Sequence, residues 1–359
     1  MLGGIAAIVA IVFFVLAHEA GHFFAAKATG MKVTEFFFGF GPRLWSTKKG
    51  ETEYGFKLVP LGGYVRVSGM NPLEEVPVED MGRTYREKKF WEKSVVVLAG
   101  VGANFLLAFL LFYGLVVSNG IPELLPVVAE VVEGSAAEDV GLRVGDRIIA
   151  LDGRTVDSWD DVPVYLREIG PNPTTITIER GGERLDIDVV LEAREGAPGV
   201  GFLGVAPELE ILDIGPVEGV GVAGGMIGEA FVTTFEGLGQ MIRPSSLLQY
   251  LGVLVGNTDL PDEIRPVSPI GIVNIGSQTS SLAFFLGMMA TVNVILGTLN
   301  LLPLFPLDGG HFAVALYEKV TGRQANMKAL IPVATAVIGI FVFLGLVAII
   351  LDIVNPIDL

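Results

Sequence analysis

The sequence predicts a polytopic α-helical membrane protein with about four transmembrane helices, a membrane-associated β-hairpin and an inserted small α+β domain. Of its 359 residues, 51% are hydrophobic, and the mean hydropathy is +0.59. That composition is typical of a membrane protein and not of a soluble one. Four long apolar runs are separated by polar stretches, and one of these stretches alternates short β-rich runs with turn residues.

Charge and cysteine content exclude several classes of function. The chain has no cysteine, which rules out disulfides, thiolate metal ligands and a catalytic cysteine. The net charge is −16, and between residues 119 and 281 nine Lys and Arg stand against 26 acids. A surface so acidic and so poor in arginine argues against nucleic acid as a partner. Because the chain has no cysteine, any metal must be held by His, Asp or Glu.

The first apolar run, Gly3–Ala28, is long enough to cross a bilayer as a helix. It lacks the basic start and cleavage site of a signal peptide, so we expect it to be retained. His18, Glu19 and His22 lie inside it, in the pattern H-E-x-x-H. On a helix, positions i and i+4 share a face, so the two imidazoles can bind one Zn²⁺ with Glu19 beside the reactive water. The alternative is a structural pair of histidines that bonds neighbouring helices.

Three further spans are predicted, at Ser94–Val117, Leu282–Leu302 and Leu330–Ile353. The second contains Asn104, which either packs against another helix or acts near the active site. The third ends in NLLPLFPLDGGH, where two prolines break the helix. A third metal ligand must come from outside the first span, and this turn offers Asp308 on what we expect to be flexible glycine-rich backbone. His311 is the only rival nitrogen ligand.

Between the first two spans, Phe36–Trp45 is rich in glycine and aromatic residues. Thr52–Gly69 is interpreted as a strand, a turn at Pro60–Gly63 and a second strand. One interpretation is an ordinary cytosolic hairpin. The other is a hairpin that lies beside the active site and offers an edge strand to an extended substrate. The candidate substrate-binding residues of this hairpin are Gly62, Gly63, Tyr64 and Val65.

The remaining segments complete the predicted organisation. Residues 1–118 hold the first two spans and the hairpin, and residues 126–208 form the small α+β domain. An amphipathic linker follows over 209–281, in which Val217–Ile242 is either an interfacial helix or a plain surface helix. Residues 282–359 hold the last two spans. The positive-inside rule places residues 28–93 and 303–330 in the cytosol, with the small domain and both termini outside.

Several motifs together resemble the site-2 protease family of intramembrane metalloproteases, and bacterial members of the family in particular. The resemblance rests on HEAGH in the first span, NLLPLFPLDGG at the end of the third and a small domain between the middle spans. The segments FGFGP, PLGGYVR, GVGANFLLA and PIGI fit as well. One departure is Val101, where relatives often carry proline. This resemblance implies zinc held by His18, His22 and Asp308, Glu19 as general base, and Asn300 as the residue that orients substrate or stabilises the oxyanion.

The small domain resembles a circularly permuted PDZ domain in its segment SAAEDVGLRVGDRIIALDG. In FLGV, the residues Leu203, Gly204 and Val205 are similar to a peptide-groove loop. A single copy is present, where some relatives have two. The resemblance implies that this domain binds a peptide or a freshly exposed C-terminus, or filters substrates by size.

The function implied is that of an intramembrane zinc endopeptidase in the cytoplasmic (inner) membrane of a bacterium. Its partners would be the lipid bilayer and single-span membrane proteins, such as anti-sigma factors or signal-peptide remnants. The alternative is a non-catalytic membrane scaffold or transporter that uses its PDZ-like domain for binding.

Overall fold

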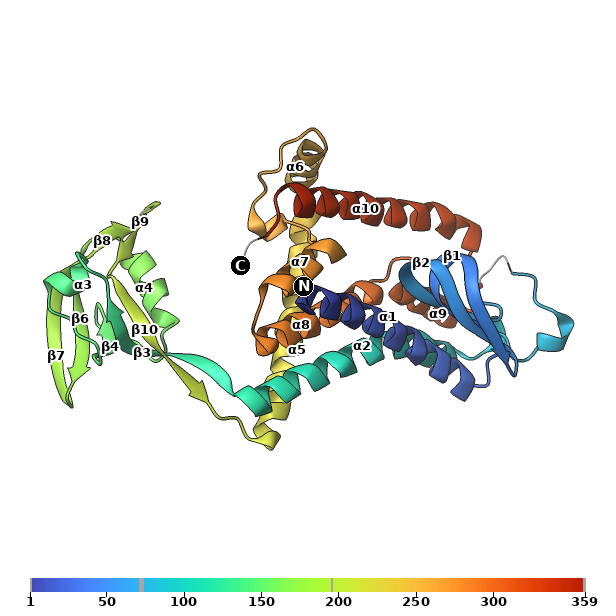
Figure 1. Cartoon of the computed structure of the whole chain (residues 1–359), viewed down its shortest axis with the longest axis horizontal. Coiled ribbons are helices and arrows are strands. Elements are labelled where there is room, and N and C mark those ends of the chain that lie inside the picture. Colours follow the sequence, from blue (N-terminus) through green and yellow to red (C-terminus); the bar gives the residue numbers. More distant parts are fainter. Residues whose placement is uncertain (1, 71–73, 195, 358–359) are drawn as a thin grey trace. The chain divides into compact units, whose positions relative to one another are not determined.

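The computed structural model describes residues 2–70, 74–194 and 196–357, and it divides into two compact units. The first unit comprises Met1–Leu115 and Val217–Leu359. The second is the continuous segment Val116–Pro216, which starts and ends some residues outside the expected range 126–208. The elements of both units are labelled in Figure 1.

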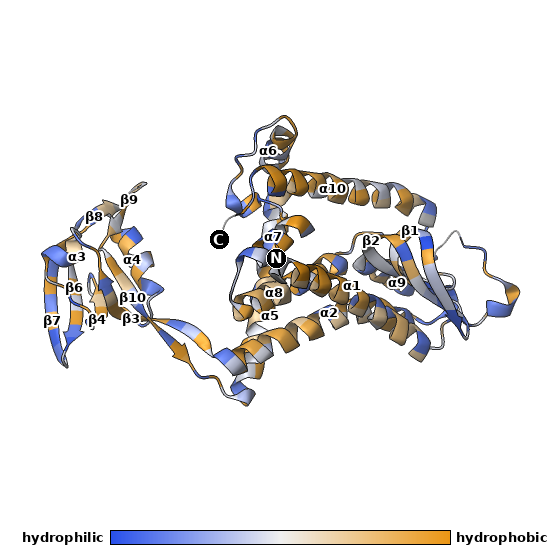
Figure 2. Cartoon of the chain, in the orientation of Figure 1, coloured by the Kyte–Doolittle hydropathy of each residue, from blue (hydrophilic) through white to orange (hydrophobic). Residues whose placement is uncertain are grey.

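Within the described residues, four helices are long and apolar enough to cross a membrane. They are α1 (Leu2–Ala28), α2 (Phe90–Asn119), α8 (Leu282–Leu301) and α10 (Met327–Val354). Figure 2 shows hydrophobic residues along most of the length of each. The four predicted spans, and with them the predicted fold class, are confirmed.

Close helix packing in the first unit depends on small residues. A Cβ added to Gly21 of α1 would collide with the backbone of Ala99 in α2, so these two helices approach to backbone contact. Further along α2, Ala108 and Phe112 pack into a buried cluster with Ala290 and Val294 of α8. The first unit is therefore assembled around α1, α2 and α8.

Shorter helices complete this unit: α5 (Pro216–Met241), α6 (Pro244–Leu254), α7 (Pro269–Gln278) and α9 (Asp308–Thr321), with 3₁₀ turns at Val78–Asp80, Tyr85–Glu87 and Asp262–Ile264. Ala223 of α5 is buried in the cluster formed by α2 and α8. One face of α5 is thus packed against the spans, and the choice between an interfacial helix and a plain surface helix for Val217–Ile242 stays a prediction. Helix α9 was not expected, since two prolines and two glycines precede or begin it.

The strands β1 (Val33–Lys49) and β2 (Thr52–Val67) form an antiparallel sheet that differs from the predicted hairpin. The two halves of Thr52–Gly69 do not pair with each other. Residues 53–56 and residues 63–66 both pair with residues 35–38, which lie between them. The strands bend at glycines with positive φ, Gly39 and Gly41 in β1 and Gly62 in β2, and the reversal between strands falls at Gly50.

One ion pair and one aromatic contact tie the first turn of α2 to α9. The Lys93 ammonium lies 3.1 Å from a carboxylate oxygen of Glu318, and the rings of Phe90 and Phe312 are 5.9 Å apart. Residues 85–93 and helix α9 therefore lie at the same end of the helix bundle. This agrees with the expectation that residues 28–93 and 303–330 share one side of the membrane.

The second unit is a β-rich domain with two helices. Its main sheet has the order β10-β3-β4-β6-β7, with β5 paired to β4, and β8 and β9 form a separate pair. The strands are β3 (Ile121–Val131), β4 (Arg147–Leu151), β5 (Arg154–Thr155), β6 (Pro173–Arg180), β7 (Glu183–Val190), β8 (Glu192–Arg194), β9 (Ala197–Phe202) and β10 (Val205–Leu212), and the helices are α3 (Ala136–Asp139) and α4 (Asp161–Ile169). Its core includes Ile148, Leu151, Ile176 and Ile178.

A buried ion pair in this second unit should make its stability depend on pH. Burial raises the pKa of Asp146, yet hydrogen bonds from Arg180 and from the Arg143 backbone outweigh it and hold the pKa below its ordinary value. The pair therefore stabilises the unit above the unfolded pKa of about 3.9, and this stabilisation is lost as pH falls through the folded pKa. We expect Asp146→Asn to lower the free energy of unfolding by about 2 kcal/mol at pH 7.

Hydrogen exchange of peptides from β4 and β6, in the full chain in detergent, measures this effect. Asp188→Asn is the matched control, because Asp188 is exposed and bonds only the Thr175 hydroxyl, and it should change stability by less than about 0.5 kcal/mol. A deficit in Asp146→Asn that stays constant from pH 7 to pH 3 would contradict the assignment.

Candidate metal centre

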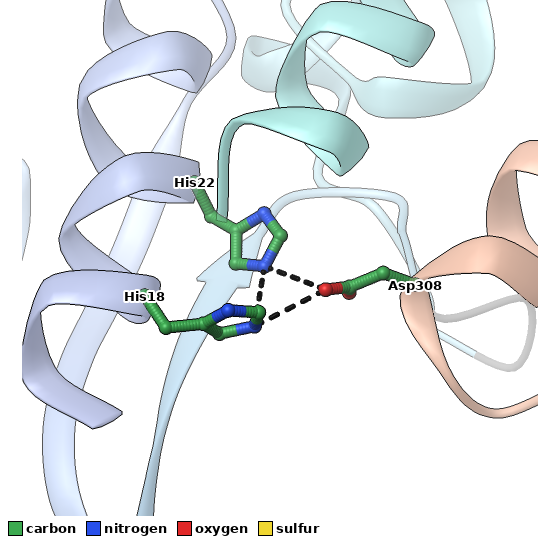
Figure 3. Close-up of side chains that lie close together, drawn as sticks. All are labelled: His18, His22 and Asp308. Carbon is green, nitrogen blue, oxygen red and sulfur yellow. Dashed lines mark hydrogen bonds and ion pairs between the residues drawn. The ribbon is translucent and has the colours of Figure 1, made fainter. Parts of the chain in front are cut away.

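Helix α1 places His18 and His22 one turn apart on the same face, and both side chains are buried. Their Nε2 atoms are 3.2 Å apart. Figure 3 shows both rings turned toward Asp308, which reaches them from α9. The Asp308 Oδ2 atom lies 3.1 Å from Nε2 of His18 and 3.2 Å from Nε2 of His22. Residues separated by about 290 positions are thus brought to one point.

Asp308 owes its position to the packing of two glycines. It is the first residue of α9, and Gly309 and Gly310 follow it in the first turn of the helix. A Cβ on Gly309 would collide with the carbonyl of Leu301, and one on Gly310 with the backbone at Phe305. The expectation of a flexible loop at this point is wrong. The glycines let the start of α9 lie directly on the end of α8, which fixes the carboxylate.

Helix α2 fixes the orientation of His22. The Nδ1 atom of His22 donates to the carbonyl of Val96 at 2.8 Å, which leaves Nε2 as the free ring nitrogen. The ring lies against Gly100, where any Cβ would overlap the imidazole. His18 lacks such a partner: its Nδ1 is buried without a hydrogen bond among the described residues.

The three atoms Nε2, Nε2 and Oδ2 form a nearly equilateral triangle with sides of 3.1 to 3.2 Å. Zinc binds nitrogen and oxygen ligands at about 2.0 to 2.2 Å in a tetrahedron, which places neighbouring ligands about 3.3 Å apart. Two imidazoles and one carboxylate are also a ligand set found in zinc enzymes. The group His18, His22 and Asp308 therefore fits a zinc ion, and three protein ligands leave a fourth position open.

A cavity of about 490 Å³ opens beside this cluster and holds Glu19 in its lining. Strand β2 forms one wall: a Cβ on Gly63 would stand 3.1 Å from Cγ of Glu19, so the strand backbone lies directly on this side chain. The backbone N–H of Val65 also donates toward the Glu19 carboxylate. The predicted hairpin residues Gly62, Gly63, Tyr64 and Val65 all line the cavity, as do Phe14, Val15, His18, His22, Phe40, Val67, Met70, Val96, Asn104, Leu296, Asn300, Pro306, Leu307, Asp308 and His311.

Three further polar residues line this cavity from different elements. Asn300 reaches the cavity from the last turn of α8, and Asn104 from the middle of α2. His311 also lines it, with its ring 4.8 Å from that of Phe305, but it is not part of the three-residue cluster. Sequence reasoning missed Asn293, a fully buried residue of α8 that bonds the backbone of Asn104. The signal was available, because an asparagine inside a predicted span is costly without a partner.

The three candidate residues of the second unit lie at the start of β10. The side chain of Leu203 is in the core of that unit. Gly204 has a φ of +85°, and its carbonyl accepts from the N–H of Val132 at 2.8 Å. Val205 pairs with Val131 of β3. The Leu203 side chain is therefore not available to a peptide, and the carbonyls of Leu203 and Gly204 are already bonded to the N–H groups of Ala137 and Val132.

Known proteins are similar to this chain in sequence and in part of its structure. The family model described as Peptidase family M50 matches residues 6–346. "Zinc metalloprotease Rip1" of Mycobacterium bovis is 32% identical over 398 residues, covering 98% of this chain and 96% of that protein. The protein of the same name in Mycolicibacterium smegmatis is 31% identical over 397 residues, covering 98% and 97%. Among solved structures, the PDZ domain of the SdrC-like protein from Listeria innocua covers 23% of this chain and 93% of that domain, at 21% identity and a TM-score of 0.21.

Membrane-length helices and a buried His-His-Asp cluster beside a glutamate define a membrane zinc metalloprotease. The match over nearly the whole chain makes the family plain. The chain belongs to peptidase family M50, the site-2 protease family.

The contact between Gly100 and His22 generates a sharp test. Gly100→Ala should displace the imidazole, because a methyl group there overlaps the ring. We expect metal affinity to fall about 10- to 100-fold, which is typical of mutations in the residues that orient a metal ligand. Zinc content of purified protein, titrated against a competing chelator, measures it.

Gly102→Ala is the matched control, since it lies on the same helix and its added Cβ would meet nothing within 4 Å. Its zinc affinity should equal that of the parent protein. Equal affinity in both variants would show that Gly100 does not position the site.

Proposed function

We propose that this chain is an intramembrane endopeptidase that cleaves the transmembrane segments of single-span membrane proteins. The observation that carries the proposal is the position of the site. His18, Glu19 and His22 lie within a helix of membrane length, so the cavity beside them opens at membrane depth. Charged groups kept at such a depth are costly and mark functional sites.

In this proposal His18, His22 and Asp308 hold the zinc ion. When bound, zinc supplies Lewis-acid activation of water and of the scissile carbonyl. The hydrogen bond from His22 Nδ1 to Val96 keeps the ligand nitrogen unprotonated and aimed at the site. Asp308 supplies the negative charge that balances the ion within the apolar surroundings.

Glu19 is the proposed general base. It lies between the two histidines in sequence, lines the cavity and is not part of the three-residue cluster. Its carboxylate takes a proton from the attacking water and passes it to the nitrogen of the leaving amine, so that the base is regenerated. The backbone of Gly63 and Val65 packs on this side chain and limits its motion.

The edge of β2 is the proposed clamp for the substrate. A transmembrane helix hides its peptide bonds in its own hydrogen bonds, so it must unwind before cleavage. Each freed N–H or C=O costs several kcal/mol in lipid unless it finds a partner. Residues 63–66 have a strand partner on one side only among the described residues, and they line the cavity beside Glu19. An extended substrate can add to the other side as a further strand.

Asn300 is the proposed residue that orients the substrate or stabilises the developing oxyanion. It lines the cavity from the end of α8, eight residues before Asp308. A carboxamide N–H that faces the scissile carbonyl is a suitable donor for a tetrahedral oxyanion.

The second unit is proposed to select substrates. As a PDZ-like domain it would receive a peptide or C-terminus along the outer edge of β10, whose other edge pairs with β3. Alternatively it would exclude substrates whose outer domains have not yet been trimmed. In the proposed division of the chain, residues 126–208 select, residues 209–281 connect, and residues 1–118 and 282–359 cleave.

The proposed location is the cytoplasmic (inner) membrane of a bacterium, with the second unit outside. The basic stretch 28–93 and the α9 region lie at one end of the bundle, and the positive-inside rule assigns that end to the cytosol. Anti-sigma factors and signal-peptide remnants are the substrate classes proposed. A non-catalytic scaffold or transporter is disfavoured, because such a protein has no need of a buried three-ligand cluster next to a carboxylate.

Replacing the proposed base, Glu19, should stop cleavage without affecting zinc binding. Glu19→Gln should lower the cleavage of a single-span substrate at least 100-fold while zinc content stays the same, because it removes the base and no ligand. Cleavage by purified protein in detergent and metal analysis measure the two quantities.

Asp308→Ala should instead release zinc, whereas His311→Ala should retain it. The reverse pattern in these last two variants would make His311 the third ligand.

Proline substitutions along β2 test the clamp. Val65→Pro removes the N–H that donates to Glu19 from the open edge of β2, so it should lower cleavage more than 10-fold without releasing zinc, because the edge loses a donor and the base loses a fixed position. Tyr64→Pro interrupts the pairing with Phe37 instead, so it should mainly lower the thermal unfolding midpoint. Substrates with helix-breaking residues near the scissile bond should be less sensitive to the unwinding cost and be cut faster. Unchanged cleavage in Val65→Pro would rule out the clamp.

A further inference from the structure

Asn104 carries a polar group that nothing in the fold explains. It lies in the middle of α2 and is 1% exposed, among residues that are otherwise apolar or small. Its Oδ1 atom is buried and has no hydrogen-bond partner among the described residues. A buried polar atom left without a partner destabilises a fold and is rare in native proteins. Such an atom indicates a missing partner.

The carboxamide lies in the wall of the reaction cavity. Asn104 lines this cavity together with Glu19 and Asp308. It follows Gly100 by four residues, so the two share one face of α2. Gly100 touches the imidazole of His22, which places Asn104 one helical turn further along the same wall.

Helix α8 holds Asn104 in place without satisfying its side chain. The Nδ2 atom of Asn293, a fully buried residue, donates to the backbone carbonyl of Asn104 at 2.8 Å. Gly297, one turn along α8, makes room for Asn104, because a Cβ there would stand 3.3 Å from its Cβ. Two residues of α8 thus fix the backbone and the Cβ of Asn104, which is one of the residues that line the cavity. This is the arrangement of a preorganised binding group.

We propose that Asn104 binds the main chain of the unwound substrate beside the scissile bond. A carboxamide offers the same donor and acceptor as a peptide group, so it can pair with a substrate N–H through Oδ1 and with a substrate C=O through its amino group. The substrate segment would be held by β2 along one edge and by Asn104 from the α2 side. This inference rests on the proposed function, and it assigns a substrate contact that the three ligands, Glu19 and Asn300 do not make.

The test replaces Asn104 with leucine, which has similar volume and no polar atom, in the full-length protein. If the amide only packs against helices, removing an unpaired polar group should be neutral or stabilising, and cleavage should be unchanged. If Asn104 binds substrate, the thermal midpoint should stay the same or rise, zinc should remain at the parent level, and kcat/KM for a single-span substrate should fall at least 10-fold. Thr298→Val is the matched control: it removes a fully buried hydroxyl that bonds only its own helix, and its kcat/KM should not change.

A binding measurement removes any dependence on folding yield or turnover. In the inactive Glu19→Gln background, a fluorescent single-span peptide should bind at least 10-fold more weakly when Asn104→Leu, or the smaller Asn104→Ala, is added. Equal affinity in the double variants, or a loss of cleavage that follows a loss of zinc, would overturn the inference. Parent protein that binds zinc yet cuts no single-span substrate would instead overturn the proposed function, so the two failures are distinguishable.

Discussion

The site depends on how closely α1 and α2 approach each other. Gly21 and Gly100 bring the two helices to backbone contact, with the imidazole of His22 lying over Gly100. At this separation Nδ1 of His22 reaches the carbonyl of Val96, and the other ring nitrogen is left to face Asp308. Within a membrane there is little hydrophobic force between helices, so contacts between small residues and a few polar bonds decide the packing. A larger side chain at either glycine would move the ligand with the helix.

A second set of close contacts brings the distant parts of the chain to His18 and His22. Gly309 and Gly310 seat the start of α9 on the end of α8, which turns Asp308 toward α1. The bends at Gly39 and Gly62 let β1 and β2 form a compact sheet whose edge at Gly63 rests on Glu19. Glycine therefore serves two purposes here. At Gly39 and Gly62 it permits a positive φ, and at Gly100, Gly309 and Gly310 it permits contact that any Cβ would block.

Polar residues within the helices differ in how many of their side-chain atoms have a hydrogen-bond partner. His22 is bonded through Nδ1, Asn293 is bonded through Nδ2 to the backbone of α2 while its Oδ1 has no partner, and Oδ1 of Asn104 likewise has no partner among the described residues. A buried group that is satisfied stabilises the fold, whereas one that is not marks a place where something else binds. The unsatisfied amide of Asn104 lies in the wall of the reaction cavity, which is where a protease must hold an extended chain.

Four spans, and a pair of histidines on one face of the first, are predicted from sequence alone. Apolar length predicts a spanning helix, and the spacing of His18 and His22 places both on one face whatever else the chain does, because both rules are local. The meeting of Asp308 with that pair is predicted by the family resemblance, since no local rule joins residues so far apart. The three-dimensional fold was needed to show how β1 and β2 pair, because residues 35–38 suit a partner on either side and the hydrophobic pattern does not choose between them. It likewise decided the role of Gly309 and Gly310: a glycine pair has the same appearance in sequence in a flexible loop and in a tight helix start, and only the neighbouring backbone of α8 distinguishes the two.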